Sequence, residues 1–196
     1  MSQTTGSDPN TRLPDLLERI GRLLRGARHR TEQLNPAQWE ALRYLSRANR
    51  YSNTPQALAD YLGLTKGTVS QTLLLLDRRG LVERFEDEID RRVVRLRLSS
   101  AGEQFLAESQ PALAWQNATR NISPNRIRNA TSALREALVT LQVDNEGTVF
   151  GTCSGCSHCQ KLSQRVYRCG QMGDRLSAPE TRKLCRIYVA KAEEVA

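Results

Sequence analysis

The chain has 196 residues and a formal net charge of +8, and 39% of its residues are hydrophobic while 26% are charged. It contains no run of about 18 consecutive apolar residues, and its N-terminus lacks a basic stretch followed by an apolar run. We therefore expect a cytoplasmic protein without a membrane span or a secretory signal. The excess of basic side chains favours an anionic partner, most commonly nucleic acid.

The first third of the chain predicts a series of capped helices. Residues 1–10 are small and polar and are expected to be disordered, whereas leucines at helical spacing predict a helix over 13–30. The pairs Asn35-Pro36 and Thr54-Pro55 are typical of helix starts, because each places a capping side chain before a proline at the first helical position. The second of these helices is expected to end at Gly63.

The next segment has the pattern of a winged helix-turn-helix. Thr65 is expected to cap a helix over 66–79 that closes at Gly80, since glycine favours the backbone conformation at helix ends. Two short runs, 81–85 and 93–98, predict strands joined by a charged tip over 86–92. A helix pair joined by a tight turn and followed by such a hairpin presents one helix to the major groove of DNA.

Two more helices are predicted after the hairpin. Ser100 and Glu103 have the spacing of a capping box for a helix over 100–118. Ser123-Pro124 opens another helix, with apolar residues at helical spacing to about residue 142.

The composition changes after Asp144, where glycine, serine, cysteine and threonine dominate and the apolar periodicity stops. We place a domain boundary at 143–147. Ser177 and Glu180 predict one final capped helix near the C-terminus. This helix would carry the side chains of Leu184, Cys185, Ile187 and Tyr188.

The helix over 66–79 has the two faces that a recognition helix needs. Val69, Leu73 and Leu76 recur at helical spacing and are expected to anchor it in the core. The other side offers short polar groups and one cation, which suit base edges and phosphates. These candidate DNA-binding residues are Thr65, Lys66, Gly67, Thr68, Ser70 and Gln71. By itself, the same face would also fit an ordinary solvated helix.

The hairpin tip strengthens the DNA-binding interpretation. Asp90, Arg91 and Arg92 place two guanidinium groups on a turn that projects from the body. The negative potential of a narrow minor groove attracts arginine. Asp90 can orient one arginine through a bidentate ion pair while the other arginine contacts DNA. A surface ion pair without function is the alternative.

Three stretches resemble the MarR family of transcriptional regulators. They are residues 34–39 (LNPAQW), residues 57–70 (ALADYLGLTKGTVS), and Asp90-Arg91-Arg92 leading to residues 98–102 (LSSAG). The resemblance covers roughly residues 10–143. It implies a homodimer with interlocking N- and C-terminal helices, and one winged lobe per subunit on a pseudo-palindromic operator in double-stranded DNA. Members usually repress transcription, and many release DNA in response to a small phenolic ligand or an oxidant. Residues 11–143 contain no cysteine, so cysteine-based sensing in that part is excluded.

All five cysteines lie in the C-terminal segment, with the spacing C-x2-C-x2-C-x9-C-x15-C. Cysteines two residues apart let one tight turn direct several thiolates at one centre, and in a reducing compartment such a cluster is more often a metal site than a disulfide framework. The candidate metal ligands are Cys153, Cys156, Cys159, Cys169 and Cys185. The first three are the firm ligands, and either Cys169 or Cys185 is the fourth.

The identity of the metal stays open between an iron–sulfur cluster and zinc. Three closely spaced cysteines with a distal fourth are closer to the cluster pattern, which we favour slightly, although no proline follows the last cysteine. Zinc sites usually have two separated pairs of ligands. His158 lies inside the motif and is expected to point away from the centre. Free thiols, or disulfides formed on oxidation, are the alternative to a metal.

The sequence as a whole predicts a mainly α-helical fold with a small β-hairpin wing, a helical dimerisation region and a cysteine-rich C-terminal extension. The predicted parts are 1–10, 11–143 and 144–196. The expected function is that of a sequence-specific DNA-binding transcriptional regulator, a repressor that responds to redox state or metal through its cysteines. One alternative is a regulator that answers an organic ligand and has a structural zinc tail. Two others are a thiol-dependent redox enzyme, for which no activating base is evident, and a winged helix used only for protein contacts.

Overall fold

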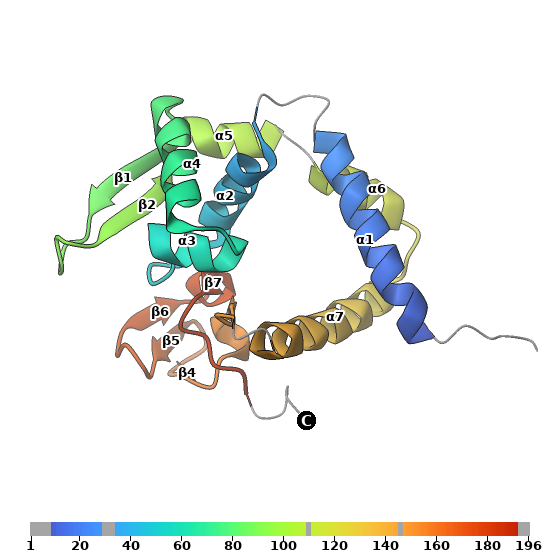
Figure 1. The fold of residues 1–196 in the computed structure, drawn as a ribbon. Coiled ribbons are helices and arrows are strands. Elements are labelled where there is room, and N and C mark those ends of the chain that lie inside the picture. Colours follow the sequence, from blue (N-terminus) through green and yellow to red (C-terminus); the bar gives the residue numbers. More distant parts are fainter. Residues whose placement is uncertain (1–8, 29–33, 109–110, 145–146, 192–196) are drawn as a thin grey trace, which may run out of the picture.

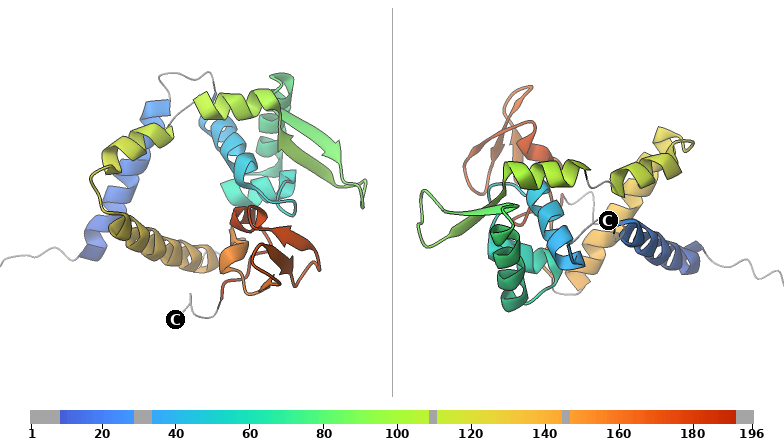
Figure 2. Two further views of the ribbon diagram at one scale, coloured as in Figure 1. Left: turned by 180° about the vertical axis from the view of Figure 1, so that it is seen from behind. Right: turned by 90° about the horizontal axis from the view of Figure 1, so that it is seen from above.

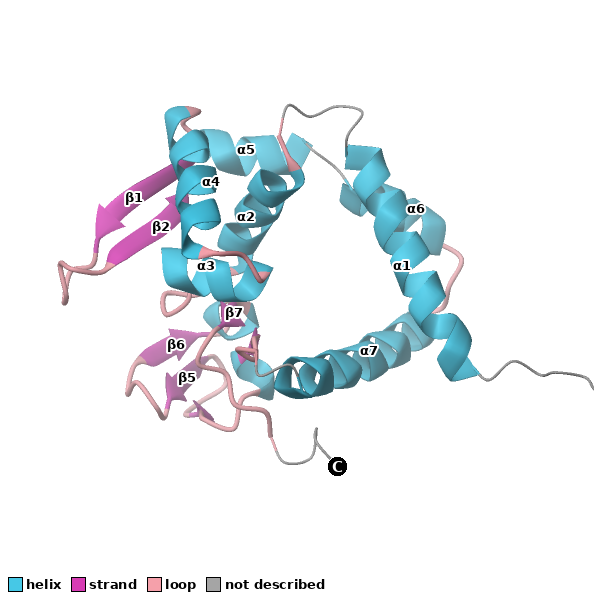
Figure 3. Cartoon of the chain, viewed as in Figure 1, coloured by secondary structure: helices cyan, strands magenta, loops and turns pink. Residues whose placement is uncertain are grey.

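The computed structural model describes residues 9–28, 34–108, 111–144 and 147–191 (Figure 1). Within these ranges the chain is mostly helical, with short strands in one hairpin and in the C-terminal segment (Figure 3). The helices are α1 (Pro9–Arg28), α2 (Pro36–Arg47), α3 (Pro55–Leu62), α4 (Lys66–Arg78), α5 (Ser100–Glu108), α6 (Pro111–Thr119) and α7 (Pro124–Asp144). The strands are β1 (Val82–Glu86), β2 (Val94–Leu98), β3 (Gly151–Thr152), β4 (Cys159–Lys161), β5 (Val166–Cys169), β6 (Arg175–Ser177) and β7 (Leu184–Cys185).

The predicted starts of α2, α3 and α4 are confirmed. The side chains of Asn35, Thr54 and Thr65 each accept a hydrogen bond from the backbone N–H three residues further on, at 2.9 to 3.2 Å. These bonds satisfy donors that a helix start leaves unpaired. Gly63 and Gly80 follow α3 and α4 with φ angles of 63° and 67°, as expected at helix ends.

The winged lobe has one core, formed by α2, α3, α4, the β1–β2 hairpin and α5. The hairpin is antiparallel, with Val82 opposite Leu98 and Glu86 opposite Val94. The largest fully buried side chains of this core are Leu42, Tyr44, Leu58, Val69, Leu73, Leu76, Val82 and Leu96. Burial of each such side chain stabilises the lobe by about 1.5–3 kcal/mol before losses of conformational entropy. The core thus fixes the two elements that project from it, α4 and the hairpin.

The single helix predicted over 100–118 is wrong, because α5 ends at Glu108 and α6 begins at Pro111. Proline has no N–H to donate to the preceding turn and disfavours helical backbone in the residue before it. The capping residue also differs from the prediction. The hydroxyl oxygen of Ser99, not that of Ser100, accepts the N–H of Gly102 at 3.0 Å.

The predicted C-terminal helix is also wrong. The Glu180 carboxylate does accept bonds from the N–H and hydroxyl of Ser177, both at 2.8 Å, but only one short 3-10 turn follows, at Glu180–Arg182. The chain then turns into β7, which pairs antiparallel with β3. A local capping signal is present, and long-range strand pairing overrides it.

Helices α1, α6 and α7 extend away from the winged lobe. α1 packs against α6, and α7 leads back toward the C-terminal strands (Figures 1 and 2). α1 begins at Pro9, inside the segment predicted to be disordered, while residues 1–8, His29 and residue 30 lie outside the described residues. These helices expose large apolar side chains: Leu13, Leu16, Leu17, Leu23, Trp115, Leu138, Leu141 and Val143. No helix in the described ranges has the length and apolarity needed to cross a bilayer.

The segment 147–191, called here the C-terminal extension, is built from short strands. β3 pairs with β7, and β4, β5 and β6 form an antiparallel sheet. The extension packs directly on the winged lobe, because Phe150 and Leu184 belong to the lobe's core cluster. The ring of Phe150 meets the rings of Tyr44 and Tyr61 edge-on, with centroids 6.1 and 5.2 Å apart. The compositional change after Asp144 thus marks a change from helices to short strands. The extension nevertheless packs into the same hydrophobic core as the winged lobe.

Candidate nucleic-acid interface

Helix α4 has the two faces that the sequence predicts. Val69, Leu73 and Leu76 are buried to 1% exposure or less. All six polar candidates on α4 and its cap, residues 65–68, 70 and 71, are exposed. The hydroxyls of Thr65 and Thr68 lie 2.9 Å apart and form a hydrogen bond at the start of the helix. The N-terminal turn of α4 therefore presents hydroxyl, amide and ammonium groups to the outside.

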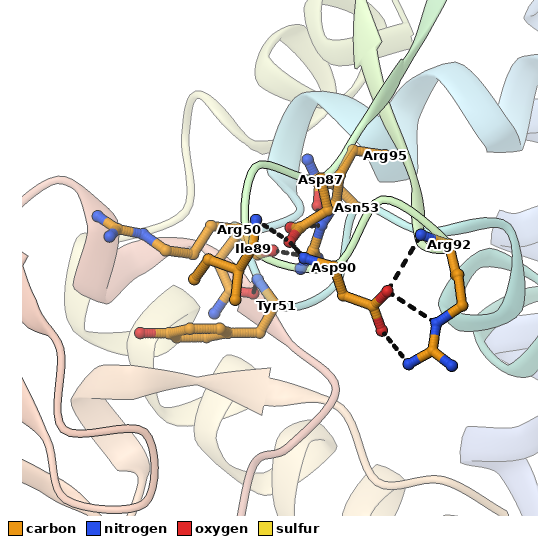
Figure 4. Close-up of polar contacts among 9 residues, drawn as sticks. Arg50, Tyr51, Asn53, Asp87, Ile89, Asp90, Arg92 and Arg95 are labelled. Carbon is orange, nitrogen blue, oxygen red and sulfur yellow. Dashed lines mark hydrogen bonds and ion pairs between the residues drawn. The ribbon is translucent and has the colours of Figure 1, made fainter.

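The wing tip is held by a turn around Asp87. The backbone N–H groups of Ile89 and Asp90 both donate to Asp87 Oδ1, at 3.0 and 2.9 Å. Asp90 in turn accepts two bonds from the Arg92 guanidinium, at 3.0 and 3.2 Å (Figure 4). These bonds lower the pKa of the Asp90 carboxyl. The predicted aspartate–arginine pair is therefore formed by Arg92, while Arg91 is exposed and forms no ion pair within the described part of the chain.

A second arginine network, which the sequence analysis did not find, supports the wing from inside. Arg95 of β2 donates to Asp87 Oδ2 at 2.6 Å and to the carbonyl oxygen of Arg50 at 2.6 Å, and it reaches Asn53 Oδ1 at 3.2 Å (Figure 4). The hydrogen bonds from the backbone N–H groups of Asp90 and Ile89, together with the bond from the Arg95 guanidinium, lower the pKa of the Asp87 carboxyl. Arg95 thereby connects the wing turn to the loop between α2 and α3. The only sequence signal that bears on Arg95 is the alternation of apolar and basic residues along β2.

A groove of about 400 Å³ lies between α4 and the hairpin. Lys66 and Ser70, both predicted, line it together with Arg84 of β1, which the sequence analysis did not select. Ile89 at the wing tip is 98% exposed and was also missed. A guanidinium in the groove and an apolar tip both suit a nucleic-acid surface, since apolar side chains can insert between base steps in the minor groove.

A separate cavity of about 320 Å³ lies between the winged lobe and α7. Arg43 and Arg47 of α2 contribute cations, Tyr44 and Tyr61 contribute aromatic rings, and Leu138 comes from α7. This volume is in the lower range of small-molecule sites. The lining combines aromatic surface with the charges of these two arginines and of Glu40, which suits a small aromatic molecule with polar groups.

The structure brings the five predicted metal ligands into one cluster. Four of the cysteines are buried and the fifth, Cys159, packs against them; all five are free thiols. The thiols of Cys153 and Cys185 are within hydrogen-bond contact, and this contact is the main reason that the pKa of Cys153 is raised and that of Cys185 lowered. Within the described residues, however, no three cysteine, histidine or acidic side chains already converge as a bound ion would require. The backbone gathers the thiols, and their side chains are not focused on one point.

Comparisons with known proteins agree with the architecture. The MarR family profile matches residues 32–93, and no curated protein matches the chain. A MarR-family transcriptional regulator from Silicibacter pomeroyi shares 25% identity over 66% of this chain and 90% of its own, with a TM-score of 0.57. A MarR family protein from Bacillus stearothermophilus shares 23% identity over 72% of this chain and 99% of its own, with a TM-score of 0.56.

A further neighbour is S. aureus MepR, solved in complex with DNA, at 22% identity over 69% of this chain and 100% of its own, with a TM-score of 0.55. These structures are matched almost over their full lengths and leave about a third of this chain unmatched. The profile match covers α2, α3, α4 and β1 and ends directly before β2. Residues 32–93 therefore match the MarR family model, and the chain has the overall fold of these MarR-family structures.

Proposed function

We propose that the protein is a sequence-specific transcriptional regulator that binds double-stranded DNA as a homodimer. The observation that carries this proposal is the exposed polar face of α4 beside a wing tipped by Arg91 and Arg92. In this arrangement α4 reads base edges in the major groove, and the wing arginines contact the minor groove or the phosphates. The DNA complexes solved for MepR and for FabT of Streptococcus pneumoniae support the same use of the fold here.

The apolar surface of the outer helices supports the proposed dimer. α1 alone exposes Leu13, Leu16, Leu17 and Leu23 at 42% to 68%. Large contiguous apolar surfaces of this kind mark association sites in monomers. A second copy of the chain that interlocks α1, α6 and α7 with its own would bury them. It would also place two α4 helices on one face, as a pseudo-palindromic operator requires.

Repression relieved by a small organic ligand is the regulatory mode that the cavity favours. The ligand would enter between α2 and α7, where Arg43 and Arg47 meet two tyrosine rings. Because the cavity joins the DNA-reading lobe to a dimerisation helix, a ligand there would bias the spacing of the two lobes. Differential binding of a few kcal/mol is enough to change DNA affinity strongly.

Binding to labelled duplex DNA by fluorescence anisotropy tests the proposal. If a dimer neutralises about eight phosphates, the slope of log affinity against log salt is roughly −7. Lys66→Ala should reduce the slope and the affinity. Arg120→Ala is the matched control, because Arg120 is an exposed cation at the turn between α6 and α7, outside α4 and the hairpin. Failure of the wild type to bind duplex DNA at low salt would favour a winged helix used only for protein contacts.

A further inference from the structure

The C-terminal extension has too little apolar material to fold on its own core. Its strands are two to four residues long. In its buried cluster the cysteines are joined by only two other buried residues, Leu176 and Tyr188. Small units with so few core side chains usually depend on disulfides or a metal. None of its five cysteines forms a disulfide.

The cysteines sit where the backbone forms sharp turns and close pairings. The N–H of Cys156 donates to the carbonyl of Cys153, and the N–H of Cys159 to the carbonyl of Cys156, both at 3.1 Å. These two successive turns carry three thiols. Cys159 is directly opposite Cys169 in the β4–β5 pair, so their side chains lie on the same face of the sheet. Cys185 of β7 is within hydrogen-bond contact of Cys153.

A buried amide donor, that of Asn49, lies beside Cys185. The amide nitrogen Nδ2 of Asn49 is buried and meets no acceptor at hydrogen-bond geometry within the described residues. Asn49 nevertheless lies close enough to Cys185 to act on its thiol. Metal-bound thiolates accept hydrogen bonds from such neighbouring groups, which tune and orient them. The Asn49 amide is therefore placed to donate to a thiolate held at Cys185 by a metal.

We propose that the cysteine cluster is a thiolate-ligated metal centre whose occupancy fixes the loop beneath the wing. Cys153, Cys156 and Cys185 are the innermost ligands, with Cys159 and Cys169 beside them. Because sites of this kind are seldom preformed, the metal itself turns the sulfurs toward a common centre and displaces their protons. The shared ligand chemistry suits zinc or an iron–sulfur cluster.

Two hydrogen bonds, one on each side of Cys185, connect the proposed metal centre to the loop between α2 and α3. The carbonyl of Leu184 accepts the N–H of Asn49 at 2.9 Å, and the N–H of Arg186 donates to the Ser52 hydroxyl at 2.8 Å. Arg186 also pairs with Asp60 of α3 at 2.7 Å. β7 is therefore joined to the loop at the position of the ligand itself.

The same loop holds the wing on its other side. The N–H of Leu96 in β2 donates to the carbonyl of Asn53 at 2.8 Å, and Arg95 bonds the carbonyl of Arg50 while holding Asp87 at the wing turn. A metal at Cys185 thus acts on the wing through one short loop. This consequence for DNA binding depends on the proposed function, whereas the metal centre itself does not.

Metal analysis of the full-length protein, purified without oxygen, is the first test. Zinc at about one per chain, or iron with sulfide and a brown colour, supports the centre and identifies the metal. Cys153→Ser and Cys185→Ser should lose the metal, while Ser157→Ala, in the same turn, should keep it. If the wild type contains neither metal and all five thiols titrate freely, the proposal is overturned.

Hydrogen exchange on the wild type before and after treatment with a chelator tests the link to the wing without any DNA. Removal of the metal should speed exchange at the amides of Asn49 and Leu96 by about tenfold or more, and metal addition should reverse this. The Leu81 amide, which donates to Leu76 at the end of α4, is the internal control. Faster exchange confined to residues 147–191 would refute the link, even if the metal is present.

Discussion

Arg91→Ala is the most informative perturbation of the wing, because the neighbouring arginine is already paired. Arg92 is bound to Asp90 through two bonds, whereas Arg91 extends into solvent from the same turn. We expect Arg91 to contact the DNA backbone or minor groove in both subunits. Each phosphate contact releases about 0.9 counterions, so removal of two contacts should change the salt slope by about 1.8 units, from roughly −7 to −5.

The loss of affinity follows from the same count. At a salt concentration near 0.15 M, the release of 0.9 counterions contributes about 1 kcal/mol per contact. Two contacts per dimer amount to about 2 kcal/mol, or about thirtyfold weaker binding. Arg92→Ala should weaken binding at least as much, since it removes a cation and also leaves the Asp90 carboxylate unpaired beside the phosphates.

Fluorescence anisotropy on one labelled duplex from about 50 to 300 mM salt measures both quantities. Arg120→Ala, outside α4 and the hairpin, should leave the slope within error of the wild type. The reasoning is refuted if Arg91→Ala lowers affinity without changing the slope, or changes neither. Either result would mean that Arg91 does not neutralise a phosphate.

Three further predictions concern stability and assembly. A Cβ atom at Gly102 would lie 2.1 Å from the Leu81 carbonyl oxygen, so Gly102→Ala should destabilise the lobe by about 2–3 kcal/mol in thermal unfolding, whereas Gly67→Ala should not. Leu16→Glu with Leu23→Glu in α1 removes two buried leucines from each subunit, at about 1.5 kcal/mol each, and should weaken the dimer by about ten-thousandfold in sedimentation. An unchanged dimer would place the interface elsewhere. Burial alone would raise the pKa of Glu180, but bonds from Ser177 and Arg50 lower it to about 2. Glu180 therefore stabilises the folded state at pH values above its unfolded pKa of about 4.3, and this contribution is lost as the pH falls toward 2. In Glu180→Gln, the free energy of unfolding measured against pH should not show this loss.

The sequence was most informative where the decisive contacts are local. The caps at Asn35, Thr54 and Thr65 are each made by a side chain and a backbone amide three residues apart. Gly63 and Gly80 adopt the left-handed backbone conformation that their residue type favours. These local signals were enough to predict α2, α3, α4 and the exposed face of α4 before any tertiary contact was known.

Prediction failed where long-range pairing decides the outcome. The Ser177–Glu180 bonds form as a capping signal would, but Leu184 and Cys185 pair with β3, more than thirty positions earlier in the chain. Pro111 did carry a visible signal against a continuous helix, whereas the capping-box spacing of Ser100 and Glu103 indicates only where a helix begins. The Arg95 network joins β2 to the wing turn and to the loop between α2 and α3, so no spacing in the sequence could reveal it.

Selection of DNA from a random duplex pool tests the central claim most directly. A homodimer with one winged lobe per subunit should enrich an inverted repeat whose half-sites are centred about 10 base pairs apart. Gln71→Ala, on the exposed face of α4, should relax the preference at one position of each half-site while the salt slope stays unchanged. Enrichment of no sequence, or of a single asymmetric site bound by a monomer, would contradict the account of this protein as a dimeric operator-binding regulator.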